Sequence, residues 1–243
     1  MDEFDIFING GSQHFEQLKD LLPKLHPFGR VHFASISLDD REIQELAPHF
    51  DVLHRPSHDT RGRGYFNHLL YCTREINALA TGKWFVKTDA DTSLRDDWFE
   101  YVEKGTRERP DAALFGVRRG LGINVSITGE LARRRLGADV RIERGKKVCG
   151  AFYVGNTAFF KQHDRLHQDV HELVYCFGPG GRNRPSHRPE SWTPEEDALG
   201  VRVAGMGSRA SEDTTRSIVV HAVGAADRMC ILGSDGRVGQ ERL

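Results

Sequence analysis

Short apolar runs alternate with amphipathic segments along the first half of the chain. Residues 4–8 are mostly apolar and lead into Asn9 and two glycines, a pattern typical of a buried strand followed by a tight turn. In the next segment Leu18, Leu21 and Leu22 recur at helical spacing. Similar alternations of strand and helix follow up to residue 117.

This alternation predicts an α/β fold, in which helices cover both faces of a mainly parallel central sheet. We expect strands at residues 4–8, 31–38, 51–53, 84–89, 112–117 and 148–156. We expect helices after Ser12, at residues 41–47 with Asp40 as cap, at 65–80, at 98–104 with Gly105 as the stop, and from Thr157 onwards. A strand-like run at residues 218–222 precedes a glycine-rich tail.

Polar residues end three of the expected strands. Asn9 and Gly10 follow the first strand, Asp39 follows the second, and Asp89 ends the strand that begins at Trp84. Ligands of such sheets bind outside the carboxyl ends of the strands, near the point where the strand order reverses. We therefore expect these residues to border a ligand site.

Asp89 and Asp91 form an Asp-x-Asp motif directly after the apolar run. In extended backbone, residues two apart share a face, so both carboxylates can project from the end of one strand. Two such oxygen donors suit a hard divalent cation that also binds substrate phosphates. The motif is short, and the alternative is that the acids here only cap the next helix, as Ser93, Asp96 or Asp97 could.

Composition narrows the function classes. The chain has 243 residues, which fits one large domain, and a formal net charge of −1, which gives no argument for a nucleic-acid partner. Its four cysteines form no Cys-x-x-Cys pair, so reduced thiols in a cytoplasmic protein are the simplest interpretation. No apolar run approaches the length of a membrane span, and the N-terminal residues lack a signal-peptide pattern.

Two later segments carry charge patterns with open interpretations. Residues 117–147 hold nine Lys and Arg against three Asp and Glu, which suits either an anionic acceptor or a solvated helix face. His163, His167 and His171 share one face of the expected helix. A zinc site there is conceivable, but a polar helix face is the better interpretation because no fourth ligand is evident.

A Gly- and Pro-rich loop at residues 177–191 precedes a helix start. Thr193 and Glu196 form a capping box there, and Pro194 occupies the first turn. These acids could therefore serve only as caps. Asp197, however, lies beyond the capping pair and directly behind the loop.

Taken together, residues 4 to about 222 resemble a nucleotide-sugar glycosyltransferase of the GT-A fold, of the family-2 or the β-1,3-galactosyltransferase and Fringe type. The resemblance rests on matches in the family's order, namely Asn9, Asp39, Asp89-Ala90-Asp91, the segment 149–156, Glu196-Asp197 and His221. The sequence shows no pattern of the secretory anchor or cysteine framework typical of the Golgi members, so we expect any kinship to be at the level of the catalytic domain.

The resemblance implies transfer of a sugar from a nucleoside diphosphate, with a UDP-sugar favoured, to a carbohydrate or other hydroxyl acceptor. It implies a bound Mn²⁺ or Mg²⁺ with Asp91 and His221 as direct ligands, while Asp89 reaches the ion through water or holds the ribose. Asn9, Gly10 and Asp39 would bind the nucleoside, and Arg61 or Arg63 would bind phosphate or base. Asp197, or else Glu196, would be the general base of an inverting reaction.

We accordingly expect a GT-A domain at residues 1–223, with a nucleotide-binding half at about 1–117, an acceptor-binding half at about 118–223, and a tail at 224–243. Two alternatives stay open. A sugar-phosphate nucleotidyltransferase shares a similar sheet, although the segment after Asn9 lacks the Arg or Lys of its phosphate loop. A non-catalytic nucleotide-sugar binding protein could use the same pocket without turnover.

Overall fold

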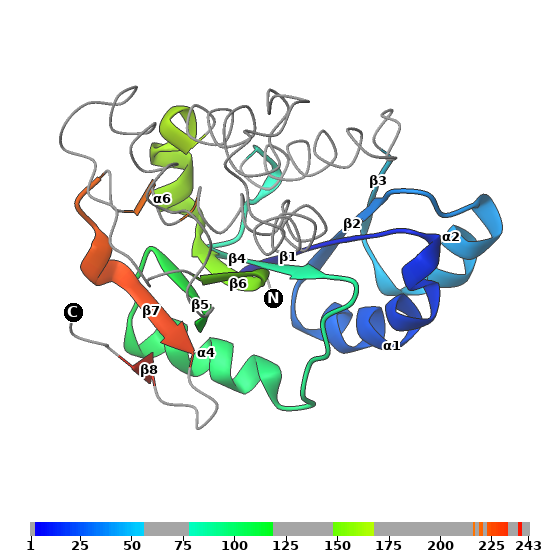
Figure 1. Ribbon diagram of the computed structural model, residues 1–243, viewed down its shortest axis with the longest axis horizontal. Helices are drawn as coiled ribbons and strands as arrows, with labels where there is room; N and C mark the ends of the chain where they lie inside the picture. Colours follow the sequence, from blue (N-terminus) through cyan, green and yellow to red (C-terminus); the bar gives the residue numbers. More distant parts are fainter. Residues whose placement is uncertain are drawn as a thin grey trace, which may run out of the picture. The chain divides into compact units, whose positions relative to one another are not determined.

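The computed structural model describes residues 3–55, 78–118, 148–167, 216, 219–220, 223–232 and 238–239. These residues form an eight-stranded sheet with the order β3-β2-β1-β4-β6-β5-β7-β8 (Figure 1). The strands are β1 (Phe4–Gly10), β2 (Arg30–Ser35), β3 (Val52–His54), β4 (Trp84–Asp89), β5 (Leu114–Arg118), β6 (Val148–Asn156), β7 (Met229–Leu232) and β8 (Val238–Gly239).

The sheet is mainly parallel. β1 pairs in parallel with both β2 and β4, β2 with β3, and β5 with β7. β6 runs antiparallel to β4, and β8 runs antiparallel to β7. The α/β class and the mainly parallel sheet predicted from the sequence are therefore confirmed.

Helices lie on both faces of this sheet. The α-helices are α1 (Phe15–Leu25), α2 (Asp40–Leu46), α4 (Trp98–Glu108) and α6 (Thr157–Gln162), and short 3-10 helices are η1 (Ser12–His14), η2 (His26–Phe28), η3 (Ala47–His49) and η4 (Ala226–Arg228). Figure 1 shows α1 and α4 along one side of the sheet. Their buried side chains pack with Ile6, Ile8 and Val86, while Phe160 of α6 meets Phe85, which alternates to the other face.

The chain divides into two compact units. The first comprises Met1–Val117, Gly150–Gln162 and Asp227–Leu243, and the second comprises Arg118–Cys149 and His163–Ala226. The predicted division into residues 1–117, 118–223 and a tail differs from this arrangement, because residues 150–162 and 227–243 belong to the first unit.

The expected tail at residues 224–243 contributes two strands to the sheet. β7 pairs with β5, and Cys230 is fully buried. The apolar run of β7 has only four residues and is surrounded by polar and glycine residues, so it does not stand out in the sequence. The strand predicted at 218–222 is also wrong where it is described, because Val219 and Val220 are helical and Val223 N donates to Val219 O at 3.3 Å.

Two predicted boundaries were wrong for a local reason. The second strand ends at Ser35, not at residue 38, and leads into the turn before α2. α4 continues past Gly105 to Glu108. A side chain at Gly105 would lie 3.3 Å from Leu232 and 3.5 Å from Phe115, so this glycine allows the helix to approach the sheet closely and does not end it.

Candidate functional site

The carboxyl ends of β1 to β4 lie at one edge of the sheet because these strands run parallel. The register aligns one residue of each strand there, and we call these four residues the edge row: His54, Ala34, Asn9 and Asp89. Their side chains alternate with the core residues that face α1 and α4, so they belong to the opposite face. With strands about 4.8 Å apart, the row spans about 14 Å.

The strand order reverses between Asn9 and Asp89. From β1 the chain builds outward through β2 and β3, and then returns to place β4 on the other side of β1. Asn9 and Asp89 are direct register partners at this switch point, where parallel α/β sheets bind ligands. Both side chains are largely buried. Two residues predicted from the sequence are thus brought together by the fold.

Gly10 provides close contact between the ends of β1 and β4. A methyl group built on Gly10 would lie 2.8 Å from Cβ of Ala90 and 3.0 Å from Leu18. Ala90 N also donates to Asn9 O at 3.2 Å. Because any side chain at this position would push β1 and the Asp-x-Asp segment apart, the glycine fixes how Asn9 and Asp89 approach each other.

Lys87 is a site residue that the sequence reasoning missed. Its Nζ donates to Oδ1 of Asp89 at 2.6 Å, and it lies 5.9 Å from the ring centroid of Tyr153. The side chains of Lys87 and Asp89 are only 4% and 10% exposed, respectively. A lysine inside an apolar strand, two residues before an aspartate and on the same face, was the available signal. The ion pair holds the Asp89 carboxylate in place.

Asp89 and Asp91 do not share a face, contrary to the expectation from strand alternation. β4 ends at Asp89, and Thr92 N donates to Asp89 O at 3.1 Å, which closes a turn. The turn leaves Asp91 exposed while Asp89 stays largely buried. The two carboxylates therefore have separate environments.

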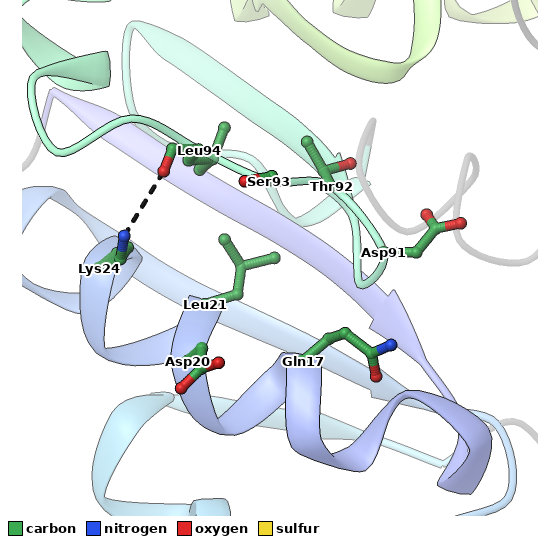
Figure 2. A pocket seen from close by; sticks show the side chains of 8 residues that line it. All are labelled: Gln17, Asp20, Leu21, Lys24, Asp91, Thr92, Ser93 and Leu94. Carbon is green, nitrogen blue, oxygen red and sulfur yellow. Dashed lines mark hydrogen bonds between the residues drawn. The ribbon is translucent and has the colours of Figure 1, made fainter.

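A hollow of about 410 Å³ lies between α1 and the segment after Asp89. Its lining is mainly polar and consists of Gln17, Asp20, Leu21, Lys24, Asp91, Thr92, Ser93 and Leu94 (Figure 2). Figure 2 shows Lys24 at one end, where its Nζ donates to Leu94 O at 3.5 Å, and Asp91 at the other. Asp91 therefore borders open space.

Asp39 is the N-cap of α2, a role predicted for Asp40. Its Oδ1 accepts a hydrogen bond from Glu42 N at 2.8 Å, and Glu42 Oε2 accepts from Asp39 N at 2.9 Å, which completes a capping box. Asp40 pairs with Arg55 instead, at 2.6 Å. One Asp39 oxygen is thus used within the helix start, and its predicted contact with a nucleoside stays a prediction.

Other predicted residues lie outside the described part of the chain. They are Arg61, Arg63, Glu196, Asp197 and His221, together with His171 and most of the basic segment 117–147. Of the remaining histidines in the proposed zinc face, His163 is partly exposed and His167 is buried.

A chain of hydrogen-bonded side chains crosses three strands and ends in the edge row. Oδ1 of Asp5 lies 3.1 Å from His32 Nε2, and His32 Nδ1 lies 3.4 Å from His54 Nε2. Oδ2 of Asp5 accepts from the backbone N–H groups of Thr81 and Gly82 at 2.6 and 2.7 Å. Asp5 and His32 are buried, so these hydrogen bonds lie in the interior of the sheet. The sequence pattern did not indicate them.

These contacts also determine the charge states. Burial raises the pKa of Asp5, but the hydrogen bonds from His32, Gly82 and Thr81 outweigh it and hold the pKa below the ordinary 3.8. Burial, and then the neighbouring His32, lower the pKa of His54 below the ordinary 6.5. At neutral pH Asp5 is therefore ionised and His54 is neutral.

The carboxylates near the edge row suit a metal ion whose remaining ligands come from the substrate. Among the described residues, no three His, Cys, Asp or Glu side chains gather in a metal-binding cluster. Asp91 is exposed, and one Asp89 oxygen binds Lys87. These donors are too few to surround a metal ion with protein ligands alone. Mg²⁺-like ions, however, commonly take one or two carboxylates and fill their other positions with water and phosphate, and the residues present fit that pattern.

Comparisons with known proteins place the chain beside several solved structures. TarS 1–349 from S. aureus is 11% identical, with 96% of this chain and 58% of TarS covered and a TM-score of 0.47. Mannosyl-3-phosphoglycerate synthase from Rubrobacter xylanophilus is 10% identical, with 65% and 55% covered and a TM-score of 0.41. CMP:2-keto-3-deoxy-manno-octonic acid synthetase in complex with CTP is 12% identical, with 84% and 86% covered and a TM-score of 0.41.

Further TarS structures similar to this chain hold UDP-GlcNAc or UDP. TM-scores of 0.41 to 0.47 are too low, however, to assign a function to this chain. The chain also spans little more than half of TarS 1–349 and of the synthase. No protein-family model matches the chain, and no curated protein sequence matches it at a significant level. Within the described ranges, no helix has the length and apolar character needed to cross a membrane.

Proposed function

We propose that this protein is a metal-dependent glycosyltransferase, which moves a sugar from a nucleoside diphosphate sugar, with a UDP-sugar favoured, to an acceptor hydroxyl. The observation that carries this proposal is the arrangement of Asn9 and Asp89 as register partners at the switch point, with Asp91 exposed directly beyond them. Polar side chains at the switch point, followed by an exposed carboxylate, suit a nucleotide with its phosphates toward Asp91.

Asn9 and Gly10 would contact the nucleoside. The Asn9 amide has both donors and an acceptor, so it can bind a ribose hydroxyl or a base edge. Gly10 lets the backbone of β1 approach Ala90 and Leu18 closely, and thereby fixes the position of the neighbouring Asn9. Asp39 would reach the nucleoside through its second oxygen, while Arg61 or Arg63 would bind phosphate or base.

Asp91 and His221 would hold a Mn²⁺ or Mg²⁺ ion, with Asp89 behind them. When bound, the ion supplies positive charge that stabilises the departing nucleoside diphosphate. The ion pair from Lys87 to Asp89 supports different roles for Asp89 and Asp91. A carboxylate that already accepts a charged hydrogen bond is a weaker candidate for direct coordination of the metal ion. Asp89 would then bind a water or the ribose, and Asp91 would be the ligand.

Asp197 would accept the proton of the acceptor hydroxyl as the new bond forms, with Glu196 as second candidate. General bases of this kind contribute typically about 10²- to 10⁴-fold to the rate. Transfer of this type inverts the anomeric centre, since the acceptor attacks from the side opposite the leaving diphosphate.

Calorimetric titration with UDP, GDP and CDP, each with and without Mn²⁺, tests the proposal. We expect one nucleoside diphosphate to bind with Mn²⁺ dependence, and Asp91→Asn to remove that dependence. Asp96→Asn is the matched control, because Asp96 is an exposed carboxylate in the same segment that bonds to Lys24, 2.9 Å away. No binding by the folded protein, or equal loss in both variants, would contradict the proposal.

A second measurement separates transfer from the related chemistry of nucleotidyltransferases. A glycosyltransferase releases nucleoside diphosphate from a nucleotide sugar when the acceptor is present. A nucleotidyltransferase instead forms nucleotide sugar and pyrophosphate from a nucleoside triphosphate and a sugar phosphate. Product formation only from the nucleoside triphosphate and the sugar phosphate would contradict the proposed glycosyl transfer and identify the protein as a nucleotidyltransferase.

A further inference from the structure

A buried lysine lies directly beside the proposed nucleotide site. The register partners of Lys87 are Phe7 on β1 and Tyr153 on β6, and all three side chains are buried. Lys87 Nζ lies 5.9 Å from the ring centroid of Tyr153 and 2.6 Å from Oδ1 of Asp89. Because aromatic neighbours on both sides keep water away, the charge of Lys87 is screened less than that of a surface lysine.

The charges of Lys87, Asp89 and Asp91 follow one another within five residues of the chain. Lys87 and Asp89 form an ion pair, so these three side chains together carry one negative charge rather than two. The Cα atoms of Asp89 and Asp91 are separated by two residues and are therefore at most about 7 Å apart. This separation is shorter than the Debye length of about 8 Å at physiological ionic strength. An ion bound at Asp91 would thus interact with both members of the pair.

This arrangement disfavours a bare cation and favours an anion. The charge of Lys87 repels a divalent cation and offsets most of the attraction that Asp89 alone would exert on it. The same charge attracts the phosphates of a nucleotide. A divalent ion that is already bound to a nucleoside diphosphate meets little of this repulsion, because the diphosphate offsets the charge of the ion.

We propose that Lys87 makes the donor site select the complex of metal ion and nucleotide over the bare metal ion. This inference rests on the proposed function for the nature of both ligands. Asp91 would bind the ion directly, while Lys87 would act through Asp89 and through its own charge. Lys87 is therefore a positioning residue that balances the charge of the site, and it sets the form in which the metal ion enters.

Two binding measurements on the folded protein test the inference without any turnover. The electron paramagnetic resonance signal of free Mn²⁺ gives the affinity for the bare ion, and calorimetric titration with UDP in a chelating buffer gives the affinity for the metal-free nucleotide. Lys87→Gln keeps an N–H donor for Asp89 but removes the positive charge. This variant should bind bare Mn²⁺ about tenfold more tightly than the wild type does, and should bind metal-free UDP more weakly by a similar factor.

Three further variants serve as controls. Lys87→Arg keeps the charge and should keep both affinities close to those of the wild type. Lys83→Gln removes an exposed lysine six residues before Asp89, about 20 Å away along the strand direction, and should also leave both affinities unchanged. Lys87→Gln combined with Asp89→Asn removes both charges of the pair, so its affinity for bare Mn²⁺ should return to near the wild-type value.

Opposite changes in the two affinities distinguish charge selection from structural damage, which would weaken both. Lys87→Gln that binds bare Mn²⁺ no more tightly than the wild type would overturn the inference, and metal-dependent UDP binding by the wild type would still leave the glycosyltransferase proposal standing. If Lys87→Gln alone does not fold, the comparison of Asp89→Asn with the double variant decides. Asp89→Asn should bind bare Mn²⁺ about tenfold more weakly than the double variant, and equal affinities would overturn the inference. A wild type that binds no Mn²⁺ even with a nucleoside diphosphate present would overturn both proposals.

Discussion

Lys87→Met is the substitution with the largest expected effect on the unfolding free energy near the site. It removes the cation from a pair whose side chains are 4% and 10% exposed, and leaves the Asp89 carboxylate without that charge. Removing one partner of a buried ion pair typically costs about 3–5 kcal/mol. For a protein of this length, each kcal/mol shifts Tm by about 2–4 °C, so Tm should fall by about 6–20 °C.

Lys24→Met is the matched control. Lys24 also donates to a carboxylate, Asp96, but those side chains are 42% and 96% exposed, so water compensates each charge when the other is lost. Its Tm should stay close to that of the wild type. Adding Asp89→Asn to Lys87→Met should recover part of the lost stability, because the buried negative charge at residue 89 is then removed as well.

Tryptophan fluorescence reports this transition from the relevant unit. Trp84 of β4 and Trp98 of α4 are both buried in the first unit, and a Trp192→Phe background removes the third tryptophan. Equal Tm values for Lys87→Met and Lys24→Met would refute the reasoning. So would a double variant less stable than Lys87→Met alone.

Three further predictions follow from packing and protonation. Gly155→Ala would place a methyl group inside the Phe85 ring, and overpacking of this kind costs about 1–3 kcal/mol in a denaturant titration; an unchanged midpoint would contradict it. Gly10→Ala should be destabilising in the wild type but less so with Ala90→Gly, since the methyl contact at 2.8 Å is then gone. The folded-state pKa of His54 lies below 6.5, so between these two values the unfolded chain binds more protons at His54 than the folded protein does. The free energy of unfolding should therefore fall as pH drops from about 6.5 through the folded-state pKa. His54→Gln should reduce this dependence of stability on pH.

The edge of the sheet could be predicted from the sequence because it depends on local signals. Apolar runs that end in Asn9 and in Asp89 indicate strand ends, and alternation with helices indicates that those ends meet at one edge. The turn after Asp89 was mispredicted, since a hydrogen bond from Thr92 N to Asp89 O ends the extended backbone at Asp89, two residues before Asp91.

The contacts between strands could not be predicted from local patterns. His32 and His54 are 22 residues apart, and only the register of β2 and β3 brings their rings together. Gly155 is another example. A Cβ atom at this position would lie 2.2 Å from Cζ of Phe85, so the glycine accommodates the Phe85 ring of the neighbouring strand. Such details depend on pairing and packing over long sequence separations.

The central claim is that the edge row and Asp91 bind a nucleotide sugar for transfer. The most direct test measures release of nucleoside diphosphate from a panel of nucleotide sugars with Mn²⁺, with an acceptor mixture, for the wild type, Asp91→Asn and Asp96→Asn. The account predicts release from one nucleotide-sugar class by the wild type and Asp96→Asn, and a loss of at least about tenfold in Asp91→Asn, as for a lost ligand of 1.4 kcal/mol or more. Release that is equal in all three proteins would contradict it.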